Sequence, residues 1–514
     1  MDLGTAFACS ASREPRAEAI VDGGRRRTYA AWYGEIRLVA GGLRRLGLKA
    51  GDHLFVVMRN RYEMATLYWA SQMLGLIFTP VSWRASTDDI AYCLEDAEAA
   101  AIAHDGSAGD GVPEAAARLR FPGERMIVLA DGSSDGIRFE RLLDGPAVDA
   151  PVGADDASTC LMLYTSGTTG RPKGVPRSHR AELAAGVSQV AHHRYRPAES
   201  TLGVMPMFHT MGIRSLLASA LVNGKLVCLG EYAAAEVLRL VEAERLSSLF
   251  LVPTMFHDIL REQTSCDLGS LSRVGYAGMA MAPALVEQCQ SRLKPEVFIN
   301  HYGSSEIYTF TICDHPGRKP GCAGRAGLNQ MIRVASADPG ADIGCDLAPG
   351  ETGEIVASMA SPEAFTGYWK RPDADARAIH GCWYRTGDLG QFDADGELYV
   401  VGRVDDMIIS AGENIFPEEI EDALVRSGLL AGVAVVGMPD ERLGARVVAF
   451  IEPARPDVTK KQLDEACLRS GLARFKRPRD YVFVKSIPRS ASGKLLRRKL
   501  RIGEYEPFWP ETMS

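Results

Sequence analysis

The chain has 514 residues, of which 46% are hydrophobic and 24% are charged, as in an ordinary globular protein with a large core. Its formal net charge of -7 and its pI of about 5.9 argue against a nucleic-acid binder, which usually carries a basic surface. The eleven cysteines are scattered and contain no CxxC pair, so we expect neither a disulfide framework nor a zinc site.

The start of the chain and its apolar runs bear on localisation. The first twenty residues lack the charged segment and long apolar run of a signal peptide. No stretch reaches the roughly 18 uninterrupted apolar residues that predict a transmembrane helix. Scattered cysteines fit a reducing compartment. We therefore expect a cytoplasmic protein without membrane insertion, and the sequence leaves a homodimer open.

The first half of the chain repeats a strand–helix–strand pattern. Residues 54–58 (LFVVM) predict a buried strand, residues 61–74 a helix and residues 77–81 the next strand. The pattern recurs at residues 201–229, and a strand at residues 249–252 precedes another helix. This alternation is typical of an α/β fold.

Two further segments complete this half. The Ala- and Gly-rich residues 97–117 predict a surface region. A strand at residues 160–164 (CLMLY) leads directly into YTSGTTGRPKG, residues 164–174, and Ser178 begins a helical run.

The character of the chain changes after about residue 400. Pro417 and three glutamates predict a helix start, because proline and acidic residues are favourable in the first turn. Strands are expected at residues 432–437 and 446–451. We expect an α/β fold in which residues 1–404 form a large domain of α/β subdomains with mixed sheets, and residues 405–514 form a small mobile α+β domain.

The stretch at residues 164–174 is suited to a polyphosphate. It interleaves four hydroxyl side chains with glycines, which let backbone N–H groups approach an anion, and Lys173 adds a positive charge. It does not match the Walker A pattern. A flexible linker is the alternative, since such tracts are often linkers, but a linker would not normally follow a buried strand and end in Pro-Lys-Gly.

The same stretch resembles the signature of the adenylate-forming superfamily, which contains acyl- and aryl-CoA synthetases, luciferases and peptide-synthetase adenylation domains. Five further motifs follow in the family's order: PMFHTMG at 206–212, YGSSE at 302–306, YRTGDL at 384–389, GRVDD at 402–406 and SGK at 492–494. Ser305 replaces the usual Thr, and Asp405 stands where many members have Lys. The resemblance is closest to 4-halobenzoate-type and benzoate-type CoA ligases.

The resemblance implies a reaction in two halves. A carboxylate attacks the α-phosphorus of ATP and expels pyrophosphate, and a thiol then attacks the acyl-adenylate and expels AMP. Glu306 is the expected Mg²⁺ ligand, and ATP, Mg²⁺ and coenzyme A are the expected cofactors, without a prosthetic group. The expected ATP and AMP ligands are Thr165, Ser166, Gly167, Thr168, Thr169, Gly170, Lys173, Tyr302, Gly303, Ser305, Asp388 and Arg403.

The C-terminal motifs imply two active states of the small domain. Lys494 is the expected catalytic residue of adenylation, where it would attract both the carboxylate and the α-phosphate. The alternative is a basic, solvated tail. Asp405 matches the hinge residue, and Gly412 matches the glycine that lets pantetheine pass close to the backbone. Phe475 and Arg477 match contacts of the CoA nucleotide.

The acid is less well determined than the reaction. The positions that match the acyl pocket of 4-halobenzoate-type ligases are His209, Thr210, Met211, Phe250, Ala277, Gly278, His301 and Tyr308. His209 is also an expected catalytic residue at the gate. A flat aromatic acid suits these positions. His301 and Tyr308 would either hydrogen-bond a ring substituent or close the pocket, and we expect Arg214 at the surface or in a salt bridge.

The favoured function is an ATP-dependent ligase that joins a benzoate-like acid to CoA. A medium-chain fatty acyl-CoA ligase and an enzyme that loads a carrier protein remain alternatives. A luciferase-like oxygenase has no distinctive support, and the presence of Lys494, Glu306 and Asp388 argues against an inactive nucleotide-binding regulator.

Overall fold

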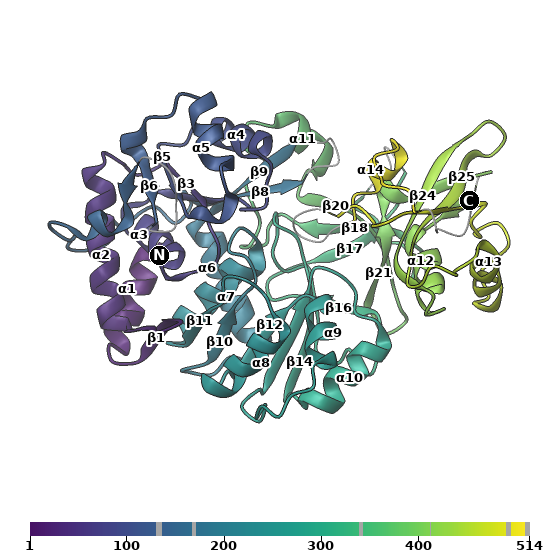
Figure 1. The fold of residues 1–514 in the computed structure, drawn as a ribbon, viewed down its shortest axis with the longest axis horizontal. Coiled ribbons are helices and arrows are strands. Elements are labelled where there is room, and N and C mark those ends of the chain that lie inside the picture. Colours follow the sequence, from purple (N-terminus) through teal and green to yellow (C-terminus); the bar gives the residue numbers. More distant parts are fainter. Residues whose placement is uncertain (130–135, 167–170, 339–342, 412, 490–494, 509–514) are drawn as a thin grey trace. The chain divides into compact units, whose positions relative to one another are not determined.

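The computed structural model describes residues 1–129, 136–166, 171–338, 343–411, 413–489 and 495–508, and its elements follow the chain in the colours of Figure 1. The chain divides into two compact units. The large unit comprises Met1–Ile332, Ala357–Tyr384 and Gly396–Leu398, and the small unit comprises Arg333–Val356, Arg385–Asp395 and Tyr399–Ser514. The predicted α/β architecture with a larger first and a smaller second part is confirmed, whereas a boundary at residues 404 and 405 stays a prediction.

The large unit contains a seven-stranded sheet with strand order β7-β6-β5-β3-β4-β8-β9. Its strands are β7 (Ile137–Arg138), β6 (Met126–Val128), β5 (Ala101–His104), β3 (His53–Val57), β4 (Ile77–Pro80), β8 (Thr159–Ser166) and β9 (Pro172–Ser178). Strands β3, β4 and β5 are parallel and fully buried, which explains their mainly apolar sequences. The prediction of a surface region at residues 97–117 is therefore wrong for Ala101–His104, because small side chains also suit a buried strand.

A second run of paired strands in the large unit has the order β16-β15-β14-β13-β12-β10-β11-β1-β2. Its strands are β16 (Cys322–Ala326), β15 (Thr311–Cys313), β14 (Val297–Tyr302), β13 (Arg273–Ala277), β12 (Ser248–Leu251), β10 (Ser200–Gly203), β11 (Lys225–Cys228), β1 (Glu18–Asp22) and β2 (Arg25–Thr28). The four neighbours β14, β13, β12 and β10 run parallel, so their carboxyl ends share one edge.

Helices cover these sheets in the large unit (Figure 1). They are α1 (Leu3–Arg13), α2 (Tyr29–Arg45), α3 (Tyr62–Leu74), α4 (Thr87–Asp96), α5 (Gly111–Arg118), α6 (His179–His192), α7 (Thr210–Leu221), α8 (Ala234–Ala243), α9 (Pro253–Arg261), α10 (Pro283–Leu293) and α11 (Pro372–Ala378). Helix α3 is buried on every side, as its apolar composition requires, and Ser178 caps α6 by accepting a hydrogen bond from Ala181 N–H.

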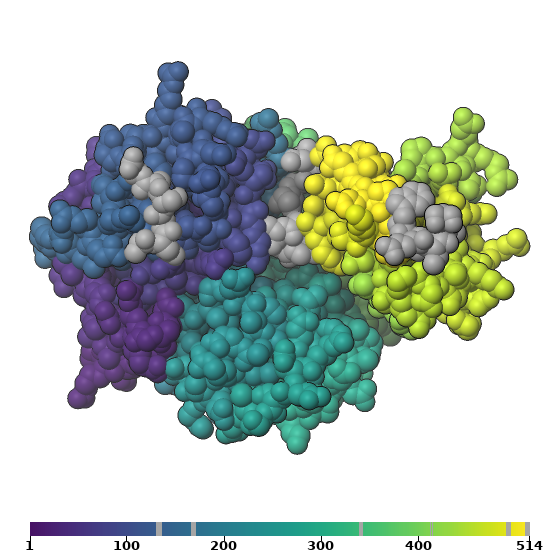
Figure 2. All heavy atoms as spheres, viewed as in Figure 1, coloured from purple at the N-terminus to yellow at the C-terminus, as the bar shows by residue number. Residues whose placement is uncertain are grey.

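One hydrophobic core joins the beginning of the chain to its middle. Leu3 and Trp32 belong to the same buried cluster as Ile213 and Leu217. Figure 2 shows the outside of this arrangement, with the purple and blue N-terminal residues packed against the teal residues of the same unit. The large unit is thus a single packed body despite its two sets of strands.

The small unit has its own strands and helices. Four strands lie mainly in it and pair in the order β17 (Ile332–Ala335), β18 (Gly353–Ser358), β20 (Trp383–Phe392) and β21 (Leu398–Arg403). A five-stranded sheet contains β22 (Ile408–Ser410), β23 (Glu413–Ile415), β24 (Leu430–Asp440), β25 (Gly444–Pro453) and β26 (Asp480–Phe483). Its helices are α12 (Pro417–Val425), α13 (Lys460–Arg469) and α14 (Arg497–Arg501), and Pro417 opens α12 as predicted.

A helix that crosses a membrane must be both long and apolar, and the helices within the described ranges fall short of this.

Replacing His53 with Gln should flatten the acid end of the stability profile. His53 is 5% exposed, its Nδ1 lies 2.8 Å from Thr79 Oγ1, and burial lowers its pKa to about 4. A histidine with a lowered pKa binds fewer protons in the folded than in the unfolded state, so stability falls as the pH drops from about 6.5 towards 4. Urea unfolding at several pH values should show this loss in the wild type, by up to about 1.4 kcal/mol per pH unit relative to His53→Gln. Parallel profiles for the two proteins would contradict the assignment.

Candidate functional site

The two described ends of the hydroxyl-rich stretch belong to two neighbouring strands. Strands β8 and β9 are antiparallel, with Thr165 opposite Lys173 and Ser166 opposite Pro172. Trp369 packs on the hairpin. Its backbone N–H donates to Gly174 O at 2.9 Å, and a Cβ added at Gly174 would lie 3.0 Å from Trp369 Cβ. The hairpin therefore holds Thr165 and Lys173 together. The predicted ligands Gly167, Thr168, Thr169 and Gly170 lie outside the described residues.

Tyr368 connects the loop lysine to the predicted metal ligand. Lys173 Nζ lies 4.1 Å from the centre of the Tyr368 ring, and Tyr368 O–H donates to Glu306 Oε1 at 2.7 Å. Burial lowers the pKa of Lys173, whereas the charge of Glu306 acts to raise it. Burial also raises the pKa of Tyr368, which therefore stays a hydrogen-bond donor. The structure thus brings Lys173 and Glu306 to one place.

The turn after β14 presents the other predicted nucleotide residues of the large unit. Tyr302 ends β14, and Glu306 is 7% exposed while Gly303 is exposed. Gly303 permits a close approach, because a Cβ there would lie 1.9 Å from Tyr308 O. Ser304 Oγ accepts hydrogen bonds from the N–H groups of Glu306 and Ile307. Tyr302, Gly303, Ser305 and Glu306 therefore share one tight turn.

Most predicted acyl-pocket residues lie near the carboxyl edge of the parallel strands. Phe250 is in β12, Ala277 ends β13 opposite His301 of β14, and Gly278 follows with φ of +87°. His209, Thr210 and Met211 form the start of α7, after β10. The Phe250 and His301 ring centres are 5.8 Å apart. In parallel sheets such an edge is where ligands usually bind.

The polar groups of His301 are already engaged inside the protein. Arg214 Nη1 lies 2.9 Å from His301 Nε2, and because arginine can only donate, this nitrogen is the acceptor. The Nδ1 atom therefore carries the proton and faces His193 Nε2 at 3.3 Å. Burial lowers the pKa of His301 well below its ordinary value, so the ring is neutral.

Tyr308 and Arg214 lie deeper than expected. The Tyr308 ring is 2% exposed, and the guanidinium carbon of Arg177 lies 3.9 Å from its centre. Arg214 is 2% exposed, donates to Tyr308 O, and has no ion pair among those of the described residues. The expectation of a surface or salt-bridge role for Arg214 is wrong, because the residue projects from a buried helix into a polar cluster.

His209 is an uncharged residue at neutral pH. It occupies the N-cap position of α7 without a side-chain capping hydrogen bond, and burial lowers its pKa to about 4. Its Nε2 atom is buried and has no partner among the described atoms. A neutral ring with a free nitrogen is suited to packing beside a substrate and not to holding an anion by charge.

The remaining residues predicted to bind the nucleotide, Asp388 and Arg403, are in the small unit. Arg403 Nη1 donates to Asp388 Oδ1 at 2.5 Å, and Asp388 N–H donates to Thr386 Oγ1 at 3.0 Å. Asp388 and Arg403 are therefore brought together. Asp405 is exposed in a short 3₁₀ helix that directly follows β21. This is a position at which a chain can bend.

The predicted CoA residues lie further along the small unit. Phe475 is 42% exposed, and Arg477 is ion-paired with Asp464 at 3.6 Å. Gly412 and the catalytic candidate Lys494 lie outside the described residues. Their roles stay predictions.

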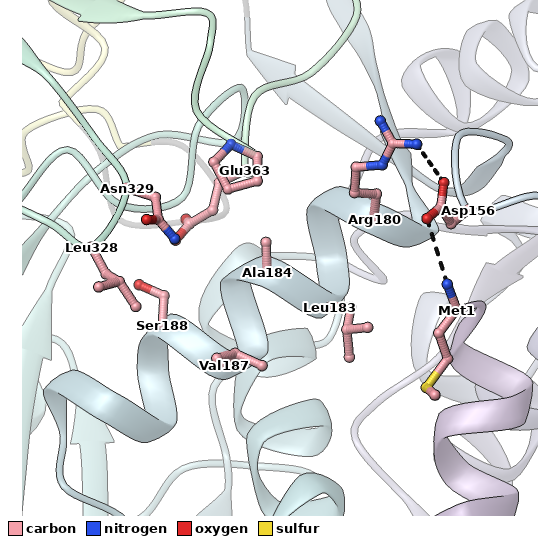
Figure 3. Close-up of a pocket in the computed structure, with 11 residues that line it drawn as sticks. Met1, Asp156, Arg180, Leu183, Ala184, Val187, Ser188, Leu328, Asn329 and Glu363 are labelled. Carbon is pink, nitrogen blue, oxygen red and sulfur yellow. Dashed lines mark hydrogen bonds and ion pairs between the residues drawn. The ribbon is translucent and has the colours of Figure 1, made fainter.

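Two hollows in the large unit lie away from these residues. Figure 3 shows one of about 290 Å³ on the outer face of α6, where Asp156 pairs with Arg180 and with the Met1 amino group. The other, of about 430 Å³, is lined by Asp22, Arg59, Asn60, Arg61, Asp105, Gly106, Ser107 and Gly230. Neither hollow is lined by a residue predicted to bind the nucleotide, the acid or CoA.

Known proteins are similar to this chain in sequence. The chain matches the family of AMP-binding enzymes over residues 7–369 and its C-terminal domain over residues 419–494. The chain belongs to the AMP-binding enzymes. It is 32% identical to a feruloyl-CoA synthase from Amycolatopsis sp, over 96% of each chain, and 32% identical to a 4-chlorobenzoate–CoA ligase from Arthrobacter sp, over 97% of this chain and 95% of the relative.

A solved structure extends the likeness to three dimensions. The o-succinylbenzoate CoA synthetase from Bacillus subtilis, in complex with its acyl-adenylate intermediate, superposes with a TM-score of 0.86 at 25% identity, over 96% of this chain and 97% of that one. The predicted membership of the adenylate-forming superfamily is confirmed.

Sequence reasoning did not identify Tyr368 or Arg177 as site residues of this AMP-binding enzyme. Tyr368 stands in FTGYWK, where an aromatic pair follows a glycine, and this pattern was a usable signal. Arg177 has only its place three residues after Gly174. Its backbone partners Glu306 and Glu363 lie 129 and 186 residues further along the chain, which no local pattern reveals.

Replacing Tyr368 with Phe should weaken the enzyme's use of MgATP. The Glu306 carboxylate loses a charge-assisted hydrogen bond that orients it, and loss of such support typically reduces metal affinity or activity by about 10- to 100-fold. The measurement is the MgATP dependence of acid-dependent pyrophosphate release. Tyr232→Phe is the matched control, because Tyr232 O–H also donates at 2.8 Å, but to Met255 O in α9 and not to a predicted metal ligand. An unchanged MgATP dependence in Tyr368→Phe would refute the orienting role.

Proposed function

We propose that the protein is an ATP-dependent carboxylate–CoA ligase that acts on an aromatic, benzoate-like acid. The single observation that carries the proposal is that Tyr368 contacts both Lys173 of β9 and the carboxylate of Glu306, which sets a cation and a carboxylate close to one tyrosine. Membership of the AMP-binding enzymes supports the reaction. Relatives named for ferulate, 4-chlorobenzoate and o-succinylbenzoate support an aromatic acid.

In the first half-reaction a carboxylate oxygen attacks the α-phosphorus of ATP, and pyrophosphate leaves. We assign the phosphates to the hairpin hydroxyls and Lys173, the adenine to Tyr302 and the ribose to Asp388. Positioned cations and N–H dipoles stabilise the charge that shifts between the phosphate oxygens. Lys494 would attract both the carboxylate and the α-phosphate. It completes the proposed catalytic set with Glu306 and His209.

The buried carboxylate of Glu306 fits a Mg²⁺ ion, since Mg²⁺ favours few carboxylates together with phosphate oxygens. When bound, Mg²⁺ supplies neutralising charge at the phosphate oxygens. Tyr368 holds the carboxylate, and Ser305 offers a further hydroxyl in the same turn.

In the second half-reaction the CoA thiol attacks the acyl-adenylate and AMP leaves. We assign the bending of the chain to Asp405, between domains at residues 1–404 and 405–514. Gly412 would let pantetheine pass, and Phe475 and Arg477 would contact the CoA nucleotide. The eleven free thiols fit a reducing compartment, which supports a cytoplasmic enzyme.

The engaged nitrogens of His301 favour an apolar acid. Both nitrogens are within hydrogen-bonding distance of Arg214 or His193, so the ring is better suited to closing the pocket than to binding a substituent. Phe250, Ala277 and Gly278 supply flat and small surfaces beside it. A benzoate ring with an apolar substituent fits this description.

A panel of acids tests the proposal. The purified protein is incubated with ATP, Mg²⁺, CoA and benzoates, halobenzoates, hydroxybenzoates, furoate, cinnamates or short- to medium-chain fatty acids, and products are identified by mass. We expect an aryl-CoA together with AMP. A fatty acyl-CoA would replace the aromatic assignment, and acyl-AMP without acyl-CoA would make a carrier protein the acceptor. No adenylate from any acid would contradict the proposal.

Substitutions at Lys494 and Gly412 should separate the two half-reactions. Lys494→Ala should slow adenylation by about 10²- to 10³-fold, because a positioned charge at the reacting oxygens is lost, and should largely spare thioester formation from supplied acyl-adenylate. Gly412→Leu should do the reverse by blocking the pantetheine path. Each half is measured separately, and equal losses in both halves would argue against two states of the small domain.

A further inference from the structure

Arg177 and Glu182 form a fully buried ion pair next to the hairpin. Arg177 lies near the end of β9, and its Nε–H donates to Glu182 Oε1 in α6 at 2.8 Å. Both side chains are 0% exposed. Burial raises the pKa of the Glu182 carboxyl, and the charge of Arg177 opposes that rise.

The guanidinium of Arg177 also holds two backbone segments. Its Nη1 donates to Glu306 O at 2.9 Å and to Glu363 O at 2.6 Å. The Tyr308 ring covers the guanidinium at 3.9 Å. The same Glu306 carbonyl accepts a hydrogen bond from Phe365 N–H at 2.9 Å. Arg177 therefore joins the hairpin strand to the two segments that carry Glu306 and lead to Tyr368.

Stability alone does not account for this pair. Replacing a buried ion pair with apolar side chains of similar volume is often neutral or stabilising, because two charges no longer have to be taken out of water. What an apolar pair would lose is a group of rigidly spaced donors, in which Nε meets Glu182 while Nη1 meets both carbonyl oxygens. Glu182 keeps that group oriented.

We propose that Arg177, oriented by Glu182, is a positioning residue that sets the backbone of Glu306 for its metal ion. The inference rests on the proposed function. Arg177 fixes the main chain of Glu306, and Tyr368 fixes its side chain. Mutating a group that orients a metal ligand typically lowers metal affinity or activity by about 10- to 100-fold.

The test measures the gain in ATP affinity that Mg²⁺ provides, which needs no acid and no turnover. ATP binding is measured by titration calorimetry in excess Mg²⁺ and in EDTA, for the wild type and for the double variant Arg177→Met with Glu182→Met. We expect the variant to fold, to bind ATP in EDTA as the wild type does, and to lose about tenfold of the Mg²⁺-dependent gain.

A second buried pair provides the matched control. Arg273 Nη1 lies 3.3 Å from Glu199 Oε2, with side chains 4% and 1% exposed, and Arg273 Nε donates to Arg194 O at 2.7 Å. Arg273 is the first residue of β13, whereas Ala277 at the other end of this strand lies at the carboxyl edge. The double variant Arg273→Met with Glu199→Met therefore removes a buried ion pair of the same kind, and it should keep the full Mg²⁺-dependent gain.

The outcomes separate the inference from the proposed function. An unchanged gain in the folded Arg177 and Glu182 variant overturns the inference alone, and so does an equal loss in the Arg273 and Glu199 control. A wild type that binds no MgATP overturns the proposed function and the inference with it. Should the double variant not fold, Arg177→Lys is measured instead, because the shorter lysine keeps the charge but has one ammonium in place of the separate Nε and Nη1 donors that meet Glu182 and the two carbonyls, and the same loss is expected.

Discussion

The parallel alignment of β14, β13, β12 and β10 is the constraint on which the site depends. Parallel strands end at the same edge of a sheet, so the residues that follow them meet although they are far apart in sequence. The turn with Glu306, the Ala277–Gly278 bend and the start of α7 all follow strands of this group. The topology brings the nucleotide turn and the expected acyl pocket together before any side chain is considered.

The charged side chains near this edge are largely buried, and each has a close polar or aromatic partner. Lys173 and Glu306 sit on either side of Tyr368, and Arg177 is paired with Glu182. In a poorly solvated environment each charge acts strongly on its neighbours and has little freedom to reorganise. Groups held in this way can meet the charge of a triphosphate without first rearranging, which is the main source of electrostatic catalysis.

Apolar runs and hydroxyl-rich turns were readable from the sequence. The strands at 54–58, 160–164 and 249–252 were predicted because buried parallel strands need continuous apolar residues, and Ser178 was readable as a helix start because its hydroxyl caps the helix. The strand Ala101–His104 was missed because alanine carries no strand preference.

The buried polar cluster was out of reach for a different reason. An arginine in a sequence predicts solvent exposure, and only its partners reveal that it is buried. Arg214 meets His301 and Tyr308 across 87 and 94 residues, and Arg177 meets Glu306 across 129. Such contacts follow from the fold and leave no periodic trace.

Arg214 also determines which nitrogen of His301 carries the proton. Since Arg214 donates to Nε2, the proton of His301 must sit on Nδ1, where His193 faces it. The hydrogen-bonding series Arg214–His301–His193 therefore satisfies the ring from inside the protein and leaves a neutral aromatic ring beside Phe250. A polar residue at a pocket position thus contributes an apolar face, because its hydrogen-bonding capacity is used by a buried arginine behind it. Under the proposed function, an acyl pocket lined by His301 and Phe250 should therefore favour a flat ring over a second anionic group.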